Sequence, residues 1–246
     1  MFAFIGTRHD LLAHLPKDKI NRIVEVGVCE GINARWLLDH LEPEILCLID
    51  RWLAYPETEP PFYYREGAEI EEFTESYLGG PGHEQATFDR LFTKTQEHFK
   101  GDERVQMYRA SSGDAVAGFD DESQDLIYID GDHAYEAVID DLFNWERKLS
   151  DDGYMVLNDH VINPTGSARY GVVQAVTTFL RRRTDYYPIA INLSNYADLI
   201  IGKRSADHSV LLRRLVQSNK VLELPDAMLS NFHRRTSGNF SWLSFN

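Results

Sequence analysis

The chain has 246 residues, of which 43% are hydrophobic and 12% aromatic, enough for one substantial core with extensions. Its 39 acidic and 25 basic residues give a formal net charge of −14. This charge repels polyphosphate backbones and anionic headgroups, so we expect no nucleic-acid and no membrane partner. The segment after Met1 has no signal-peptide or transmembrane stretch, and Cys29 and Cys47 lie in apolar runs. A cytoplasmic protein with free thiols is expected.

Strand-like apolar runs alternate with helical periodicity, which predicts repeated βα units and a mostly parallel sheet. The predicted strands cover residues 22–28, 45–50, 105–109, 126–130, 154–158, 187–193 and 197–201. The predicted helices cover residues 33–41, 135–149 and 172–182, and Gly153 is expected to end the second of them. We place all of these elements in one domain, residues 1–204.

Two regions depart from this alternation. Residues 53–83 are rich in Pro, Tyr and Glu, and we expect either a lid over a substrate or a solvated surface excursion. The lid would use the aromatic residues Tyr55, Phe62, Tyr63, Tyr64 and Tyr77. Residues 205–246 are a C-terminal extension with a helix predicted over 209–221. Its last stretch carries Phe240, Trp242 and Phe245, the only sequence feature that favours a non-catalytic interaction protein.

The turn after the first predicted strand carries an acid and two glycines. Glu25, Gly27 and Gly31 have the spacing E-x-G-x-x-x-G, and neither G-x-G-x-x-G nor G-K-[ST] is present. Glycine lets a ligand approach the backbone closely, whereas the charge of Glu25 repels a diphosphate. Asp50 ends the next strand, where a carboxylate accepts both hydrogen bonds of a ribose diol. Each feature alone is weak, but together they predict an adenosine-type ligand with a cationic end.

From about residue 22 to residue 203 the sequence resembles the class I S-adenosylmethionine-dependent methyltransferases. The resemblance implies an α/β Rossmann-like fold of three layers, with a mostly parallel seven-stranded sheet and helices on both faces. It implies S-adenosylmethionine as cofactor, with Glu25, Gly27 and Gly31 at the methionine end and Asp50 on the ribose. It also assigns to the adenine side Ser111, Ser112 and Asp114, of which the two serines are equally plausible as turn formers.

Acidic and amide side chains close the fourth and fifth predicted strands. The first set lies in the run Asp-Gly-Asp-His-x-Tyr-Glu, which begins at Asp130, and the second is Asn158-Asp159-His160. If the two strands are neighbours, about 4.8 Å apart, then Asp130, Asn158 and Asp159 share one cation. This all-oxygen set suits Mg²⁺, whereas zinc usually recruits more nitrogen or sulfur. The alternative is purely structural: acids that solvate loops, and Asp132 as a helix cap.

The same run with its later Asn-Asp pair resembles the metal-dependent O-methyltransferases of the macrocin and mycinamicin type, which act on sugar hydroxyls of antibiotics. The resemblance implies that Asp130, Asn158 and Asp159 bind the metal, with Asp130 also beside the cofactor, although the commoner pair is acid-Asp. It places the general base at His133 or Asp132. We prefer His133, because a nearby divalent cation favours its neutral, proton-accepting form, and Asp132 would then orient the ring.

The predicted function is Mg²⁺-dependent transfer of a methyl group from S-adenosylmethionine to a hydroxyl of a small molecule. Chelation of the metal by two neighbouring oxygens indicates a sugar, a glycosylated natural product or a catechol-like diol. One alternative is an S-adenosylmethionine-binding antibiotic hydroxylase component without turnover. Another is a nicotinamide-dependent oxidoreductase, which the missing G-x-G-x-x-G disfavours. A homo-oligomer remains open.

Overall fold

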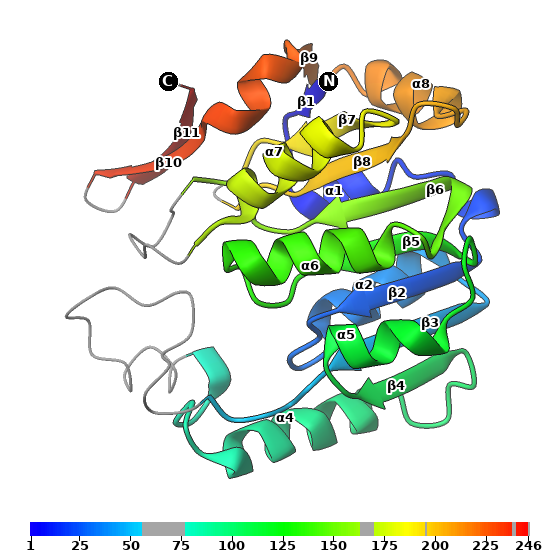
Figure 1. Cartoon of the computed structure of the whole chain (residues 1–246), viewed down its shortest axis with the longest axis vertical. Helices are drawn as coiled ribbons and strands as arrows, with labels where there is room; N and C mark the ends of the chain where they lie inside the picture. Colours follow the sequence, from blue (N-terminus) through cyan, green and yellow to red (C-terminus); the bar gives the residue numbers. More distant parts are fainter. Residues whose placement is uncertain (56–76, 163–169, 195, 238–239, 246) are drawn as a thin grey trace.

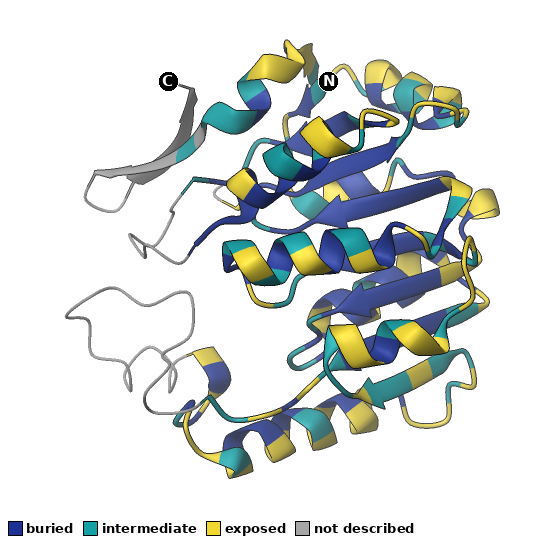
Figure 2. Cartoon of the chain, in the orientation of Figure 1, coloured by how far each residue is buried: buried dark blue, intermediate teal, exposed yellow. Residues whose placement is uncertain are grey.

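The computed structural model describes residues 1–55, 77–162, 170–194, 196–237 and 240–245, with backbone alone for 232, 234–237 and 240–245. A central sheet is covered by helices on both faces, which confirms the predicted three-layer α/β architecture (Figure 1). The inner strands are mostly buried, the two edge strands are partly exposed, and the helices expose their outer sides (Figure 2). None of the helices in the described residues is long and apolar enough to cross a membrane.

All seven predicted strands are present. They are β2 (Arg22–Val26), β3 (Ile45–Asp50), β4 (Val105–Arg109), β5 (Gln124–Ile129), β6 (Leu149–Leu157), β7 (Tyr186–Asn192) and β8 (Leu199–Lys203). The sheet order is β4-β3-β2-β5-β6-β8-β7-β1-β9. Strand β8 runs antiparallel to its neighbours β6 and β7. The pairs β2–β3, β2–β5, β3–β4 and β5–β6 are parallel.

Two short strands extend the sheet beyond the seven that the sequence predicted. Strand β1 (Phe2–Phe4) pairs in parallel with β7, and β9 (Val221–Glu223) pairs antiparallel with β1. The C-terminal segment continues through a 3-10 helix, η3 (Asp226–Asn231), into a separate hairpin of β10 (Phe232–Ser237) and β11 (Phe240–Phe245). Both ends of the chain therefore contribute to the same edge of the main sheet.

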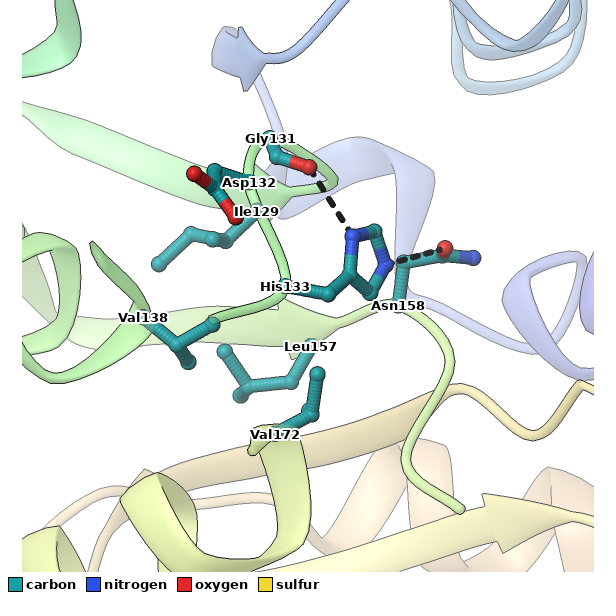
Figure 3. Close-up of a pocket in the computed structure, with 8 residues that line it drawn as sticks. All are labelled: Ile129, Gly131, Asp132, His133, Val138, Leu157, Asn158 and Val172. Carbon is teal, nitrogen blue, oxygen red and sulfur yellow. Dashed lines mark hydrogen bonds between the residues drawn. The ribbon is translucent and has the colours of Figure 1, made fainter. Parts of the chain in front are cut away.

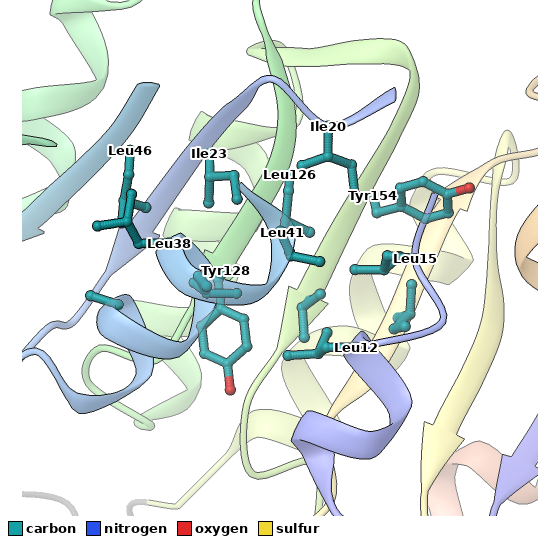
Figure 4. Packing of buried hydrophobic residues seen from close by; sticks show 14 of the residues in the cluster. Leu12, Leu15, Ile20, Ile23, Leu38, Leu41, Leu46, Leu126, Tyr128 and Tyr154 are labelled. Atoms are coloured by element: carbon teal, nitrogen blue, oxygen red, sulfur yellow. The ribbon is translucent and has the colours of Figure 1, made fainter. Parts of the chain in front are cut away.

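Each face of the sheet has its own hydrophobic cluster, because successive strand residues point to opposite faces. Helices α5 (Ser112–Ala115), α6 (Tyr135–Trp145) and α7 (Val172–Arg182) pack on one face. Helices α1 (Arg8–Leu12), α2 (Ile32–Leu41), α4 (Gln85–His98) and α8 (Ser209–Gln217) pack on the other. On this second face, Leu12 and Leu15 of the N-terminal segment lie against Leu41 and Tyr154 (Figure 4).

The predicted boundary between the second helix and the fifth strand is wrong. Helix α6 ends at Trp145, and β6 begins at Leu149, where the prediction still had helix. Gly153 lies inside β6 and does not end the helix. A Cβ at Gly153 would lie 2.8 Å from Leu149 Cδ1, so the glycine admits the fully buried Leu149 beside an irregularity in the β5–β6 register. Similarly, the predicted helix 209–221 ends at Gln217.

The insertion and the aromatic tail lie partly outside the described residues. Residues 56–76, which include Phe62, Tyr63 and Tyr64, lie outside the described part, as do the side chains of Phe240, Trp242 and Phe245. Of the remaining lid residues, Tyr55 packs edge-on against Phe88 of α4, and Tyr77 is exposed. The role of the insertion as a lid stays a prediction.

The turn after β2 depends on the absence of a side chain at Gly27. We expect Gly27→Ala to destabilise the protein by more than about 3 kcal/mol, because φ is +86° and a Cβ would lie 2.0 Å from the Asp130 carbonyl oxygen. Gly101→Ala, at φ +81° with no atom within 4 Å, should cost about 1 kcal/mol. Gly113→Ala, in open space within α5, should be neutral or slightly stabilising. Urea denaturation measures all three, and equal losses for Gly27→Ala and Gly101→Ala would contradict the close-approach argument.

Candidate functional site

A tight turn at the carboxyl end of β2 brings three strands together. Gly27 donates its N–H to the Ile49 carbonyl of β3, and the Asp130 N–H after β5 donates to the Val26 carbonyl, at 2.8 and 2.7 Å. Gly31 has φ +79° and precedes α2, where a Cβ would press on Thr95 and Phe99. The two glycines that the sequence singled out are thus required by close packing: Gly27 leaves room for the Asp130 carbonyl, and Gly31 for Thr95 and Phe99.

Glu25 has a buried carboxyl group, one oxygen of which has no hydrogen-bond partner among the described residues. Its Oε1 accepts a hydrogen bond from Asn33 Nδ2 of α2 at 3.1 Å, and Oε2 is buried with no hydrogen-bond partner among the described residues. Burial raises the pKa of Glu25 to about 8, and the nearby charge of Asp50 adds to this, whereas Asn33 and Arg8 oppose it. A cation beside the unpartnered Oε2 would favour the charged carboxylate again, so Glu25 suits a cationic ligand group.

Asp50 is held by the backbone of the turn. Its Oδ2 accepts from the N–H groups of Val28 and Cys29, each at 2.9 Å, and its Oδ1 accepts from the Trp52 N–H at 2.8 Å. A carboxylate has about four acceptor positions, so roughly one remains for a ligand. Asp50 lies where the sequence placed it, at the end of β3, but this geometry offers one hydrogen bond to a ribose diol instead of two.

The serines after β4 have structural partners. Ser111 caps α5 by accepting from the Asp114 N–H at 3.1 Å, and its hydroxyl donates to Asp114 Oδ2 at 2.6 Å. Ser112 Oγ accepts from Trp145 Nε1 at 2.7 Å. These contacts agree with the alternative that the sequence left open, turn formers, and any contact of these residues with adenine stays a prediction.

Four of the predicted metal and base residues meet at the carboxyl ends of β5 and β6, which pair in parallel. His133 Nε2 lies 3.3 Å from Asn158 Oδ1, 3.7 Å from Asp130 Oδ1 and 3.6 Å from Asp159 Oδ2. Figure 3 shows the ring of His133 between Gly131 and Asn158. Apolar side chains of Ile129, Val138, Leu157 and Val172 line the small pocket beside it.

The orientation of the His133 ring is fixed by backbone. Its Nδ1 lies 2.9 Å from the Gly131 carbonyl oxygen, which only accepts, so Nδ1 carries a proton and donates it there. Nε2 consequently faces the three oxygens of the cluster. Burial lowers the pKa of His133, and its hydrogen bonds with Asn158 and Gly131 oppose this shift. In the neutral ring Nε2 carries the lone pair that a base requires, and Nε2 donates to Asn158 Oδ1 only once it has taken up a proton.

Asp132 lies apart from this cluster. Its Oδ1 accepts from the Ala134 N–H at 2.9 Å, just before α6, and its side chain points away from the His133 ring (Figure 3). The sequence analysis expected Asp132 either as a cap or beside the base. The contact lies in the turn before α6, whose N-cap residue Ala134 has no side-chain cap, so Asp132 does not cap the helix. The ring contact expected of Asp132 is made by the Gly131 carbonyl.

The negative charges of the cluster lie close to one another. Burial raises the pKa of Asp130 well above its usual range, and the charge of Asp159 raises it further, whereas Arg8 opposes the shift. Arg8 Nη1 lies 4.0 Å from Asp130 Oδ2. Within the described ranges, no group of three or more His, Cys, Asp or Glu side chains has the arrangement of a metal site. The cluster thus has the donor atoms for a hard cation without a preformed ligand cage.

Three residues of this region were missed by the sequence analysis: Arg8, Tyr128 and Asp198. Asp198, just before β8, is fully buried, and burial raises its pKa to about 7. It accepts from the Tyr128 hydroxyl at 2.5 Å and from Asn158 Nδ2 at 3.0 Å. Because the amide nitrogen of Asn158 is held by Asp198, the amide oxygen faces His133. No local motif marks Asp198, which lies 40 residues after Asn158.

The raised pKa of Glu25 predicts a pH-dependent stability. The carboxyl titrates near pH 4.5 in the unfolded chain and near pH 8 in the folded protein, so folding binds a proton between these values. Below pH 4.5, Glu25→Gln and the wild type should differ by a constant amount. As the pH rises toward 8, the wild type should lose stability relative to the variant, on the order of 3 kcal/mol. Urea denaturation at pH 5 and pH 8 measures this.

The matched control for this series is Glu97→Gln, on the exposed side of α4. Its difference from the wild type should stay constant across the same pH range, because this side chain is exposed to solvent. A Glu25→Gln difference that is equally flat would refute the buried, mostly protonated carboxyl described here.

A family model described as a methyltransferase domain matches residues 24–160, more than half of the chain. A protein from Corynebacterium glutamicum has a similar fold, at 14% identity and TM-score 0.51, with 81% of each chain covered. A Podospora anserina methyltransferase solved with bound SAH is 13% identical, at TM-score 0.51, with 81% of this chain and 80% of that chain covered.

A protein from Staphylococcus aureus described as a caffeoyl-CoA O-methyltransferase is 15% identical, at TM-score 0.51, with 80% of this chain and 85% of that chain covered. At such low identity these three structures show the fold alone. Among curated proteins no sequence matches the chain. The family match covers the glycine turn, Asp50 and the whole cluster from Asp130 to Asp159. The chain belongs to the methyltransferase domain family.

Proposed function

We propose that the chain is an S-adenosylmethionine-dependent O-methyltransferase that acts on a small molecule with two neighbouring oxygens, such as a sugar diol or a catechol. The observation that carries the proposal is the position of Asp130. Its backbone packs against Gly27 of the ligand turn, and its carboxylate lies beside His133 and Asp159. One residue thus joins a nucleoside turn to a site where an acceptor oxygen can lose its proton.

Methyl transfer to oxygen needs alignment and a base. When bound, S-adenosylmethionine supplies a methyl group on a positively charged sulfur. His133 Nε2 would take the proton of the acceptor hydroxyl, so that this oxygen can receive the methyl group while the sulfur keeps the bonding electron pair. Glu25, with its unpartnered oxygen, would hold the ammonium of the methionine end, and Asp50 would accept a hydrogen bond from one ribose hydroxyl.

The donor set beside His133 fits Mg²⁺. Two carboxylates, Asp130 and Asp159, and the amide oxygen of Asn158 are hard ligands, and the raised pKa of Asp130 reflects two like charges that a cation would separate. These three residues would hold the ion. When bound, Mg²⁺ lowers the pKa of an acceptor hydroxyl and fixes its direction. In the protein alone Arg8 opposes these charges, and His133 adds a positive charge only when it is protonated.

Two other functions remain to be separated from this one. An S-adenosylmethionine-binding protein without turnover, of the antibiotic hydroxylase-component type, would use the same turn and lack methyl transfer. A nicotinamide-dependent oxidoreductase is disfavoured by the family match and by the missing G-x-G-x-x-G. The match to a methyltransferase-domain family supports transfer over mere binding.

The metal and the base give separable effects on turnover. Methyl transfer to a vicinal diol should vanish with EDTA and return with Mg²⁺, whereas calorimetric binding of S-adenosylhomocysteine should persist, because the ion contacts the acceptor and not the nucleoside. Asp159→Asn should imitate chelation. His133→Ala should keep Mg²⁺ binding and lower kcat by roughly 10²–10⁴-fold, the usual contribution of a positioned base.

The control is Asp140→Asn, an exposed acid on α6 that should leave both measurements unchanged. Full, chelator-insensitive turnover of both Asp130→Asn and Asp159→Asn would show that the acids are structural. Binding of S-adenosylhomocysteine with no transfer to any diol, with or without Mg²⁺, would favour the non-catalytic alternative. Tight binding of NAD in its place would favour the oxidoreductase.

A further inference from the structure

Arg8, the first residue of α1, lies outside the residues that the family model matches, and the fold places its positive charge beside the site. It lies 120 residues before Tyr128, whose hydroxyl is 3.5 Å from Arg8 Nη1. The other neighbour of the same nitrogen is Asp130 Oδ2, at 4.0 Å. A guanidinium has five N–H donors, and both of these contacts are long. Arg8 therefore has donors to spare for a ligand, and one third of its side chain is exposed.

The position of Arg8 is fixed by its helix. Thr7 and Asp10 form a capping box around the start of α1, with the Thr7 side chain accepting from the Asp10 N–H. Leu11 and Leu12 are fully buried in the cluster that α1 shares with α2 and β2. This anchoring keeps the guanidinium at the carboxyl ends of the strands instead of free in solvent.

Glu25 presents the complementary group on the same face of the sheet. Glu25 and Tyr128 are register partners on the parallel pair β2–β5, so their side chains point to the same side. That side is the one covered by α1 and α2. The unpartnered Glu25 Oε2 and the guanidinium of Arg8 are thus both next to Tyr128, and their charges influence one another.

An acceptor without a donor and a cation with donors to spare together match a zwitterion. We infer that Arg8 binds the α-carboxylate at the amino-acid end of the nucleoside cofactor, while Glu25 and Asp130 accept from its α-ammonium. This inference rests on the proposed function. It makes α1 part of the cofactor site. The site then selects a nucleoside that carries both an α-ammonium and an α-carboxylate, and not adenosine alone.

The competing role for Arg8 is that of a counter-ion for the buried acids. Arg8 lies near Asp130, Asp159 and Asp198, whose charges all stabilise its protonated form. A counter-ion alone would not distinguish an ammonium-bearing ligand that places a carboxylate on Arg8 from one that has no carboxylate. A carboxylate partner, in contrast, predicts a loss that depends on whether the ligand carries a carboxylate, because paired Arg–carboxylate hydrogen bonds are among the stronger contacts in proteins.

The test is calorimetric titration of three ligands. S-adenosylhomocysteine carries both charged groups, its decarboxylated analogue carries the ammonium alone, and 5′-methylthioadenosine carries neither. Arg8→Gln should weaken the first by roughly 10- to 100-fold and the other two by less than about twofold. Arg22→Gln, which removes one exposed charge at the opposite end of β2, should change none of them. Arg8→Lys should fall between Arg8→Gln and the wild type.

The wild type alone already tests the inference if a variant fails to fold. It should bind S-adenosylhomocysteine at least about tenfold more tightly than the decarboxylated analogue. Equal affinity for these two ligands, or an equal loss for all three in Arg8→Gln, would overturn the role of Arg8 and leave the proposed function standing. Failure of the wild type to bind any of the three would overturn both.

Discussion

The close approach of β2 and β5 at their carboxyl ends determines how this site is built. Gly27 leaves room for the Asp130 carbonyl, which would lie 2.0 Å from any Cβ there, and Asp130 in return donates its N–H to Val26. This contact places the ligand turn directly beside the acidic cluster. A direct displacement requires the donor and the acceptor to be neighbours in this way.

The second constraint is electrostatic. Glu25, Asp130 and Asp198 are acids whose pKa values burial raises, and Arg8 is the cation that opposes this for all three. A site of this kind is poorly compensated in the protein alone and favours ligands that carry positive charge. The sulfonium and ammonium of S-adenosylmethionine are such groups, and so is a divalent cation, which links the stability of the fold to the chemistry proposed for it.

The sequence predicted the elements with strong patterns and missed what depends on tertiary contact. Helix α7 has the predicted bounds because its apolar residues recur every three or four positions, whereas α4 was missed because few of its residues are apolar. Leu149 continued a helical pattern but belongs to β6. The metal residues of the cluster followed from strand ends, and His133 from the family resemblance. Arg8 and Asp198 reach the cluster from distant segments, so only the folded chain reveals them.

The central claim is that a methyl group passes from a bound nucleoside to an acceptor oxygen. The most direct measurement is carbon NMR of reactions with S-adenosylmethionine labelled with ¹³C at the methyl group, run against a panel of sugars and catechols with vicinal hydroxyls. The account predicts that the label appears as an O-methyl ether on one member of the panel, with one S-adenosylhomocysteine formed for each ether. Label on nitrogen or carbon, or label retained on the cofactor across the whole panel, would contradict it.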